Sequence, residues 1–139
     1  MIRTFFMLAV ALGAGASNAE QVRTRDFVIR YNALSADGLP AASAKAQGLA
    51  HTPEQGLLNV SVSRIDNDAS VAATVKGSIK TLTGDAIALK IRPLTESGVT
   101  TYLGTFTVPG SSSLHFVLDV TPVGGSTEHI EFNQDFITE

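Results

Sequence analysis

Three histidines are the side chains of this sequence best suited to bind a metal ion: His51, His115 and His129. His115 and His129 fall in two consecutive predicted strands that are joined by a glycine turn at 124–125. The register of that turn separates the two rings by about five residues, or roughly 16 Å at ~3.3 Å per residue, which is too far to share an ion. His51 falls in a predicted loop. The sequence therefore predicts no metal site and no cofactor.

Other segments with possible catalytic or ion-binding chemistry lack the residues that this chemistry needs. The segment 66–70 begins like a calcium loop but has no glycine or bidentate glutamate at the required positions, so an Asx-rich turn is expected there. The serines at 111–113 lack the strand-to-helix elbow of a hydrolase nucleophile. Glu131 and Asp135 share a strand face that should be solvated, where carboxyl pKa values stay ordinary. We therefore predict no catalytic residue.

Four cations form the first candidate interaction surface: Lys76, Lys80, Lys90 and Arg92. Two consecutive predicted strands, joined by a turn at Gly84, would place them together on the outer face of one hairpin. Such a face would contact an anionic ligand or the cell envelope. The alternatives are a solubilising face, salt bridges to the acidic C-terminal hairpin, or lysines that block edge-to-edge aggregation.

A second candidate site lies where the predicted helix meets the predicted sheet. Tyr31 and Asn32 end the first predicted strand, and Lys45 lies in the helix that follows. A concave pocket with these polar groups converging would favour an enzyme. A closed, packed junction would count against one.

Most of the chain alternates apolar and polar residues in short runs that end at Gly, Pro, Asn, Asp or Ser, which is typical of β-strands. Seven strands are predicted, at 26–32, 57–64, 71–82, 87–92, 101–108, 114–121 and 128–137. In the last strand the alternation turns Gln134 inward, so a β-bulge is expected near it.

One segment, 39–48, has helix-forming residues with Pro near its start and Gly at its end, which predicts a short helix after the first strand. The predicted fold is thus all-β: an antiparallel, immunoglobulin-like β-sandwich of about seven strands with one short helix. A small closed β-barrel is the alternative, because alternation alone does not fix strand order.

The N-terminal residues have the three regions of a Sec-type signal peptide. A basic start is followed by an apolar run over 4–12 and by small residues that end at Ala19. Cleavage is expected after Ala19, with Ala16 as the alternative site, leaving residues 20–139 as one domain in the periplasm. The apolar run is shorter than the roughly 20 residues that cross a bilayer, so no membrane span is expected.

Composition narrows the possible partners further. The chain carries 10 basic and 13 acidic residues, with a formal net charge of −3 and no basic stripe, so a nucleic-acid partner is not expected. It has no cysteine, so packing and not disulfides must hold the fold. Both methionines lie in the signal segment, which removes the soft ligands of a copper(I) carrier.

Several short motifs occur together along the predicted mature chain. They are Tyr31-Asn32-Ala33, Leu39-Pro40, Ala44-Lys45-Ala46 with Gly48, the run 56–62, Ala73-x-Val75-x-Gly77, Leu82-x-Gly84, Tyr102-Leu103-x-Thr105-Phe106, Phe132 and Phe136. With these motifs the chain resembles domain-of-unknown-function family forty-four twenty-six, small exported proteins of Gram-negative bacteria. Gln47 departs from it, since the family is expected to have an aromatic residue there. The resemblance implies the architecture and export, and no activity.

We therefore expect a non-catalytic binding or protein-interaction module of the periplasm, whose partner is an unknown envelope protein or an anionic ligand. One alternative is a small periplasmic enzyme with its site at the helix–sheet junction. Another is a chaperone-like protein that offers a sheet edge to a client strand, and an unprotected long edge strand would be its mark.

Overall fold

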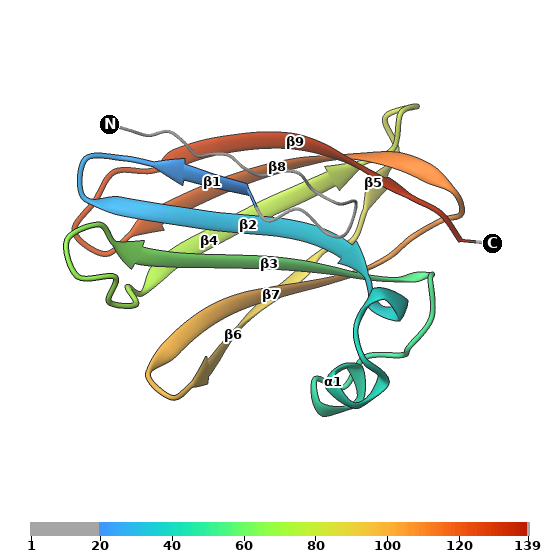
Figure 1. Ribbon diagram of the computed structural model, residues 1–139. Helices are drawn as coiled ribbons and strands as arrows, with labels where there is room; N and C mark the ends of the chain where they lie inside the picture. Colours follow the sequence, from blue (N-terminus) through green and yellow to red (C-terminus); the bar gives the residue numbers. More distant parts are fainter. Residues whose placement is uncertain (1–19, 139) are drawn as a thin grey trace.

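The computed structural model describes residues 20–138, which fold into two antiparallel β-sheets packed face to face (Figure 1). Sheet A has the spatial order β1 (Glu20–Arg23), β2 (Phe27–Ser35), β3 (Gln55–Arg64), β7 (Val99–Thr107) and β6 (Lys90–Glu96). Sheet B has the order β5 (Ala86–Ile87), β4 (Ala73–Lys80), β8 (Ser112–Pro122) and β9 (Glu128–Phe136). In residues 20–138 every strand pairs within its own sheet, so the sandwich prediction is confirmed and the barrel alternative does not form. The predicted signal peptide, 1–19, lies outside the described residues.

Alternation along each strand sends one row of side chains into the space between the sheets. Fully buried members of this inner row include Ile29, Leu58, Val60, Leu114, Leu118 and Val120. Burial of such aliphatic side chains contributes roughly 1.5–3 kcal/mol each, which makes the inter-sheet layer the main source of stability.

Aromatic rings fill the centre of this inter-sheet layer. Phe116 stacks on Phe132 with ring centroids 4.7 Å apart and planes at 5°. Phe106, from sheet A, meets the Phe116 ring edge-on at 5.5 Å and 72°. Offset and edge-on contacts are the favourable geometries for aromatic pairs. The rings therefore tie the two sheets together.

The predicted fourth strand, 87–92, is divided between the two sheets. Its start is β5, which pairs with β4 in sheet B, and its end belongs to β6, which pairs with β7 in sheet A. Leu89 lies in the crossing and packs against the inter-sheet core. A Cβ at Gly104 would stand 2.8 Å from Leu89 Cδ1, and one at Gly77 3.1 Å from its Cδ2. Glycine on each sheet thus makes room for the side chain that crosses.

Two smaller features of the strand prediction were wrong. β1 was not predicted, because its four residues carry a single apolar side chain that packs against the core, Val22. The bulge expected near Gln134 is absent: β9 pairs with β8 without interruption, and Gln134 lies opposite Leu114. Because β9 is an edge strand, the half-buried Gln134 side chain needs no bulge to escape the core.

The predicted helix is confirmed as α1 (Ala41–Ala46), which follows a 3₁₀ turn, η2 (Ala36–Gly38). It lies beyond the end of β2, at one end of sheet A (Figure 1). A second apolar cluster joins them, made of Ala36, Ala44, Leu49, Leu57 and Leu103. Gly48, at φ +74°, ends the helix in a left-handed turn. Within residues 20–138, neither helix has the length and apolarity to cross a bilayer.

Candidate functional site

The structure does not bring together the residues of the predicted helix–sheet pocket. Tyr31 points into the inter-sheet core, where its ring lies 4.9 Å from that of Phe132. Asn32 points to the opposite face of sheet A and accepts a hydrogen bond from Asn59 Nδ2 at 3.2 Å. Lys45 is exposed on α1. The junction itself is filled by the second apolar cluster.

Tyr31 has the largest pKa shift among the described residues. Burial is the main cause, and the nearby charge of Glu20, whose Oε1 accepts the phenol hydrogen bond at 3.2 Å, is the second; together they raise the pKa of Tyr31 to about 12. A raised pKa stabilises the folded state below the ordinary tyrosine value of 10.0, and this contribution is lost as pH rises through about 12.

We expect Glu20→Gln to lower the pKa of Tyr31 without returning it to 10.0, because burial remains. An absorbance titration of tyrosinate measures this shift. Glu54→Gln is the control, since Glu54 lies in the loop before β3. A pKa for Tyr31 of 10.0 in the unaltered protein would contradict the burial argument.

The four predicted surface cations separate into two pairs on opposite faces of the sandwich. Lys76 and Lys80 lie on β4, where they pair with Asp119 and His115 of β8 in sheet B. Lys90 and Arg92 lie on β6 of sheet A, and Arg92 Nη2 donates to the Gln47 backbone oxygen at 3.1 Å. The hairpin that was expected to unite them does not form, because the chain crosses between sheets after β5.

Two of the histidines lie closer to each other than the sequence predicted. The register of β8 and β9 pairs His115 with Asn133 and His129 with Asp119, four positions away along β8. Both rings reach Glu131 from opposite sides, with Nε2 to carboxylate distances of 3.1 Å for His115 and 2.8 Å for His129. The predicted separation of about five residues counted backbone positions only. It did not include the length of the two side chains, which both extend toward Glu131.

The charges of this region support one another. Asp119, and to a lesser extent Glu131, raise the pKa of His129. His129, and then His115, hold the pKa of Glu131 below its ordinary value. As the side chains stand in residues 20–138, no three or more His, Cys, Asp or Glu form a group that could hold a metal ion. His51 lies elsewhere, 2.9 Å from the Leu39 backbone oxygen.

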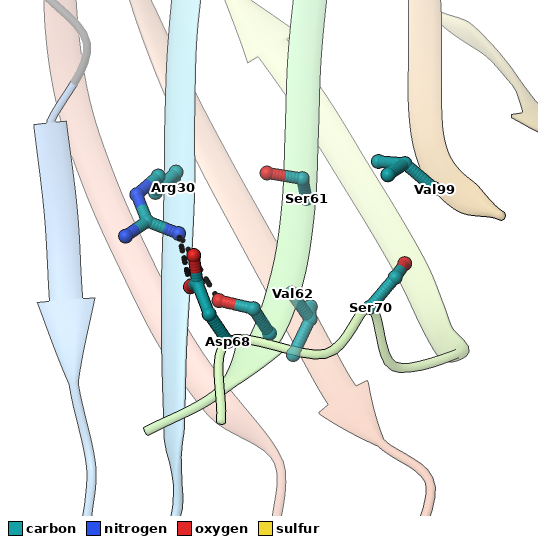
Figure 2. Close-up of a pocket in the computed structure, with 7 residues that line it drawn as sticks. Arg30, Ser61, Val62, Asp68, Ser70 and Val99 are labelled. Carbon is teal, nitrogen blue, oxygen red and sulfur yellow. Dashed lines mark hydrogen bonds and ion pairs between the residues drawn. The ribbon is translucent and has the colours of Figure 1, made fainter. Parts of the chain in front are cut away.

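The outer face of sheet A has a polar hollow beside the β3–β4 loop, which Figure 2 shows in close-up. We name it the Arg30 hollow; it has a volume of about 190 Å³ and is lined by Arg30, Ser61, Val62, Ser63, Asp68, Ser70 and Val99. Arg30 Nη1 donates to Ser63 Oγ at 3.0 Å and lies 3.9 Å from Asp68 Oδ1. One guanidinium and several hydroxyl groups thus line the hollow.

The loop after β3 closes this hollow through its own backbone geometry. Asn67 Oδ1 accepts from the Ala69 amide at 3.0 Å, the Asx turn that the sequence predicts. Asp68 has φ +59°, a left-handed conformation that Asp tolerates better than most residues. The chain then returns beside β3, where Ser70 forms an isolated antiparallel β-bridge with Ser63. The Ser70 hydroxyl accepts a hydrogen bond from the Thr100 amide at 3.0 Å.

Sequence reasoning missed the Arg30 hollow, although part of its signal was present. Alternation on β2 and β3 turns Arg30, Ser61 and Ser63 to the face opposite the core. Their proximity depends on the pairing of β2 with β3. The remaining side of the hollow depends on how the 65–70 loop folds back beside β3.

A second open hollow lies at one end of the sandwich, between the β1–β2 loop and the β8–β9 turn. Its volume is about 300 Å³, and its walls include Arg25, Asp26, Gly124 and Glu128. Two carboxylates face one guanidinium here, so this hollow does not select for an anion.

Several solved structures resemble this fold. A crystal structure of a DUF4426 family protein from Pseudomonas aeruginosa PAO1 is 29% identical, with a TM-score of 0.73, over 87% of this chain and 96% of that one. A copper-bound variant of FetP of uropathogenic Escherichia coli is 10% identical, with a TM-score of 0.62, over 88% of this chain and 97% of that one. FetP as isolated from periplasmic expression is also 10% identical, with a TM-score of 0.61, over 89% and 98%.

At 10% identity, the likeness to FetP concerns the fold alone. No protein with curated annotation matches this sequence. The model of one family, described as "Domain of unknown function (DUF4426)", matches residues 21–139. This match covers all but one of the residues after Ala19, as the sequence motifs implied. The chain therefore belongs to the DUF4426 family.

Proposed function

We propose that the protein is a non-catalytic binding module of the periplasm, and that the Arg30 hollow recognises a carboxylate on an envelope protein or on a small anionic ligand. The observation that carries this proposal is the placement of the Arg30 guanidinium on β2, bonded to Ser63, in a hollow that Ser61 and Ser70 also line. A guanidinium and hydroxyl donors on one wall match the acceptor atoms of a carboxylate.

Arg30 is only weakly paired with the one carboxylate of the hollow. The only ion pair of Arg30 among residues 20–138 is with Asp68, at 3.9 Å, and the Asp68 side chain is 79% exposed. Exposed pairs of this kind contribute about 0–1 kcal/mol, so a ligand carboxylate can displace Asp68 at little cost. The guanidinium has five N–H donors, of which Ser63 takes one.

The volume of the hollow sets the size of what it can hold. Pockets for whole small molecules measure roughly 300–1,000 Å³, and the Arg30 hollow has about 190 Å³. It therefore suits one charged group at the end of a larger partner, such as a peptide carboxylate.

The hydrogen bonds of the hollow support binding more than catalysis. Ser63 accepts from Arg30, and Ser70 accepts from the Thr100 amide. Within residues 20–138, no hydrogen bond joins a serine of the hollow to a histidine or a carboxylate, the arrangement that activates a hydroxyl nucleophile.

Export supports the periplasmic part of this proposal. Residues 1–19 have the basic, apolar and small-residue regions of a signal peptide. A sandwich without cysteine needs no oxidising folding step and tolerates the periplasm unchanged.

We expect Arg30→Gln to weaken carboxylate binding about 10- to 100-fold, because a hydrogen bond to a charged group contributes about 1.5–3 kcal/mol. The probe is acetyl-dialanine, with its C-terminal amide as the uncharged comparison. Backbone NMR shifts of residues 61–70 and 99–101 report on binding. Arg25→Gln is the matched control, since Arg25 lines the other hollow.

Two results would count against the proposal. The amide could bind as well as the acid, or the Arg30 and Arg25 variants could bind the acid equally. If only the acid binds and Arg30 alone matters, quantitative capture from an envelope extract, repeated with Arg30→Gln, separates a protein partner from a small ligand.

A second candidate function is strand addition, which one observation favours. β9 is a nine-residue edge strand without proline, and within residues 20–138 only β8 pairs with it. A client strand would therefore find a long ladder. Hydrogen exchange separates the two candidates: a strand partner protects β9 amides, whereas a carboxylate protects only amides around the Arg30 hollow.

A further inference from the structure

The outer face of sheet B carries a cluster that the proposed function does not use. We call it the histidine patch: His115 and Asp119 on β8, with His129, Glu131 and Asn133 on β9. Residues two apart on a strand share a face, and the β8–β9 register sets the two rows side by side. The patch thus lies across two strands that pair directly with each other.

Each histidine ring in the patch is held at both nitrogens. His129 Nδ1 lies 2.8 Å from Asp119 Oδ1, and His115 Nδ1 lies 2.7 Å from Asn133 Oδ1. The Nε2 atoms point to the two different oxygens of Glu131, at 2.8 Å for His129 and 3.1 Å for His115. Two rings are therefore fixed from behind and aimed at one carboxylate.

This is the arrangement that protein metal sites use to orient their ligands. A metal-bound histidine donates its other ring N–H to a carboxylate or carbonyl oxygen, which fixes the tautomer and the ring direction. Asp119 and Asn133 supply such oxygens. Two imidazoles and one carboxylate are also a known ligand set for zinc, with one position left open.

We propose that the histidine patch binds one divalent transition-metal ion of the Zn²⁺ class. His115 Nε2, His129 Nε2 and the Glu131 carboxylate are the ligands. Asp119 and Asn133 are positioning residues that act through the rings. This site lies on the face of the sandwich opposite the Arg30 hollow, so it is independent of the proposed carboxylate binding.

Metal binding requires only side-chain movement. In the structure the Nε2 atoms hydrogen-bond to Glu131 and do not yet converge as ligands. The ion replaces these two hydrogen bonds by coordination and releases the Nε2 protons, as ligand histidines must be neutral. The side chains of His115, His129 and Glu131 are 37%, 56% and 51% exposed, so their rotation leaves the core intact.

The neighbouring lysines set the conditions of measurement. Lys76 lies beside Asp119, and Lys80 beside His115, on the β4 side of β8. Glu131 lies on the β9 side, away from both lysines. At about 0.15 M ionic strength, where the Debye length is about 8 Å, salt reduces the repulsion between these lysines and a cation.

The test is calorimetric titration of the purified protein with Zn²⁺ at neutral pH. We expect one ion per chain, at least a ~10-fold loss of affinity in Glu131→Gln, and a larger loss when both His115 and His129 are replaced by alanine. His51→Ala is the matched control and should bind as the unaltered protein does, since His51 lies outside the patch. Unchanged thermal midpoints exclude misfolding as the cause.

A second readout separates ligands from positioning residues. Nitrogen-15 NMR of the imidazoles should show Zn²⁺ at Nε2 of His115 and His129, with Nδ1 still protonated. Asp119→Asn should lower the affinity by about 10- to 100-fold while metal stays at Nε2. The proposal is overturned if Zn²⁺ does not bind, if the double histidine variant binds it as tightly, or if His51→Ala causes the same loss.

Discussion

Replacing Phe116 with alanine is expected to lower the free energy of unfolding by about 3–5 kcal/mol. Phe116 is fully buried on β8, stacks on Phe132 at 4.7 Å, and meets Phe106 edge-on at 5.5 Å and Phe136 at 6.4 Å. Removing the ring leaves a cavity between the two sheets that the surrounding rings cannot fill. Since whole domains are stable by about 5–15 kcal/mol, this loss is a large share of the total.

Chemical denaturation with urea measures this effect as a lower midpoint. Leu82→Ala is the control, because Leu82 is 81% exposed and its truncation should change stability by no more than about 0.5 kcal/mol. If Phe116→Ala does not fold, Phe116→Leu retains much of the volume and should still lower the midpoint. Equal midpoints for Phe116→Leu, Leu82→Ala and the unaltered protein would show that the aromatic cluster does not join the sheets.

Replacing Gly56 with alanine is expected to cost about 1–3 kcal/mol, although only one methyl group is added. A Cβ on Gly56 would overlap the ring of Phe106, its partner across β3 and β7. That ring cannot turn away, because it is buried and meets Phe116 and Phe136 edge-on at 5.5 and 5.7 Å. The steric cost therefore exceeds the gain of about 0.4–1 kcal/mol that Gly to Ala gives where space allows.

Two variants sharpen this prediction. Gly38→Ala is the matched control, since its Cβ would meet only Leu34 Cδ1, at 3.9 Å. Combining Gly56→Ala with Phe106→Leu should cost less than the sum of the two single changes, because the smaller side chain removes the overlap. Urea midpoints of the unaltered protein and of the four variants test both statements. Strict additivity would rule out the clash as the cause.

The two proposed sites use the two outer faces of one rigid sandwich. The Arg30 hollow lies on sheet A and presents a guanidinium. The histidine patch lies on sheet B and has donors for a cation. Because the inter-sheet core separates them, Arg30→Gln should leave Zn²⁺ affinity unchanged, and Glu131→Gln should leave carboxylate binding unchanged. Each variant is thus a control for the other site.

Local patterns in the chain predicted most of the fold. The inward row Leu58, Val60 and Val62 follows from alternation over one strand, and all three residues are buried. The short helix follows from its composition and from Gly48, whose φ of +74° ends it. Such signals succeed because side-chain period and turn chemistry depend only on residues a few positions apart.

Features that depend on pairing between distant segments were not predicted. The four residues of β1 include a single apolar side chain, so alternation did not predict this strand. It forms by pairing with the edge of β2. The strand expected at 87–92 shows ordinary alternation, but Leu89 carries it from one sheet to the other through space left by Gly77 and Gly104. That crossing separated Lys76 from Arg92.

The sequence by itself determined the inner and outer faces of each strand that it predicted, and therefore that Arg30, His115 and Glu131 would lie on outer faces. Only the tertiary structure decided which outer residues are neighbours. The register of β8 and β9 brings two histidines to Glu131, and the return of the loop after β3 encloses Arg30. Alternation is a local property of the backbone, whereas strand order and register are set by the packing of the whole core.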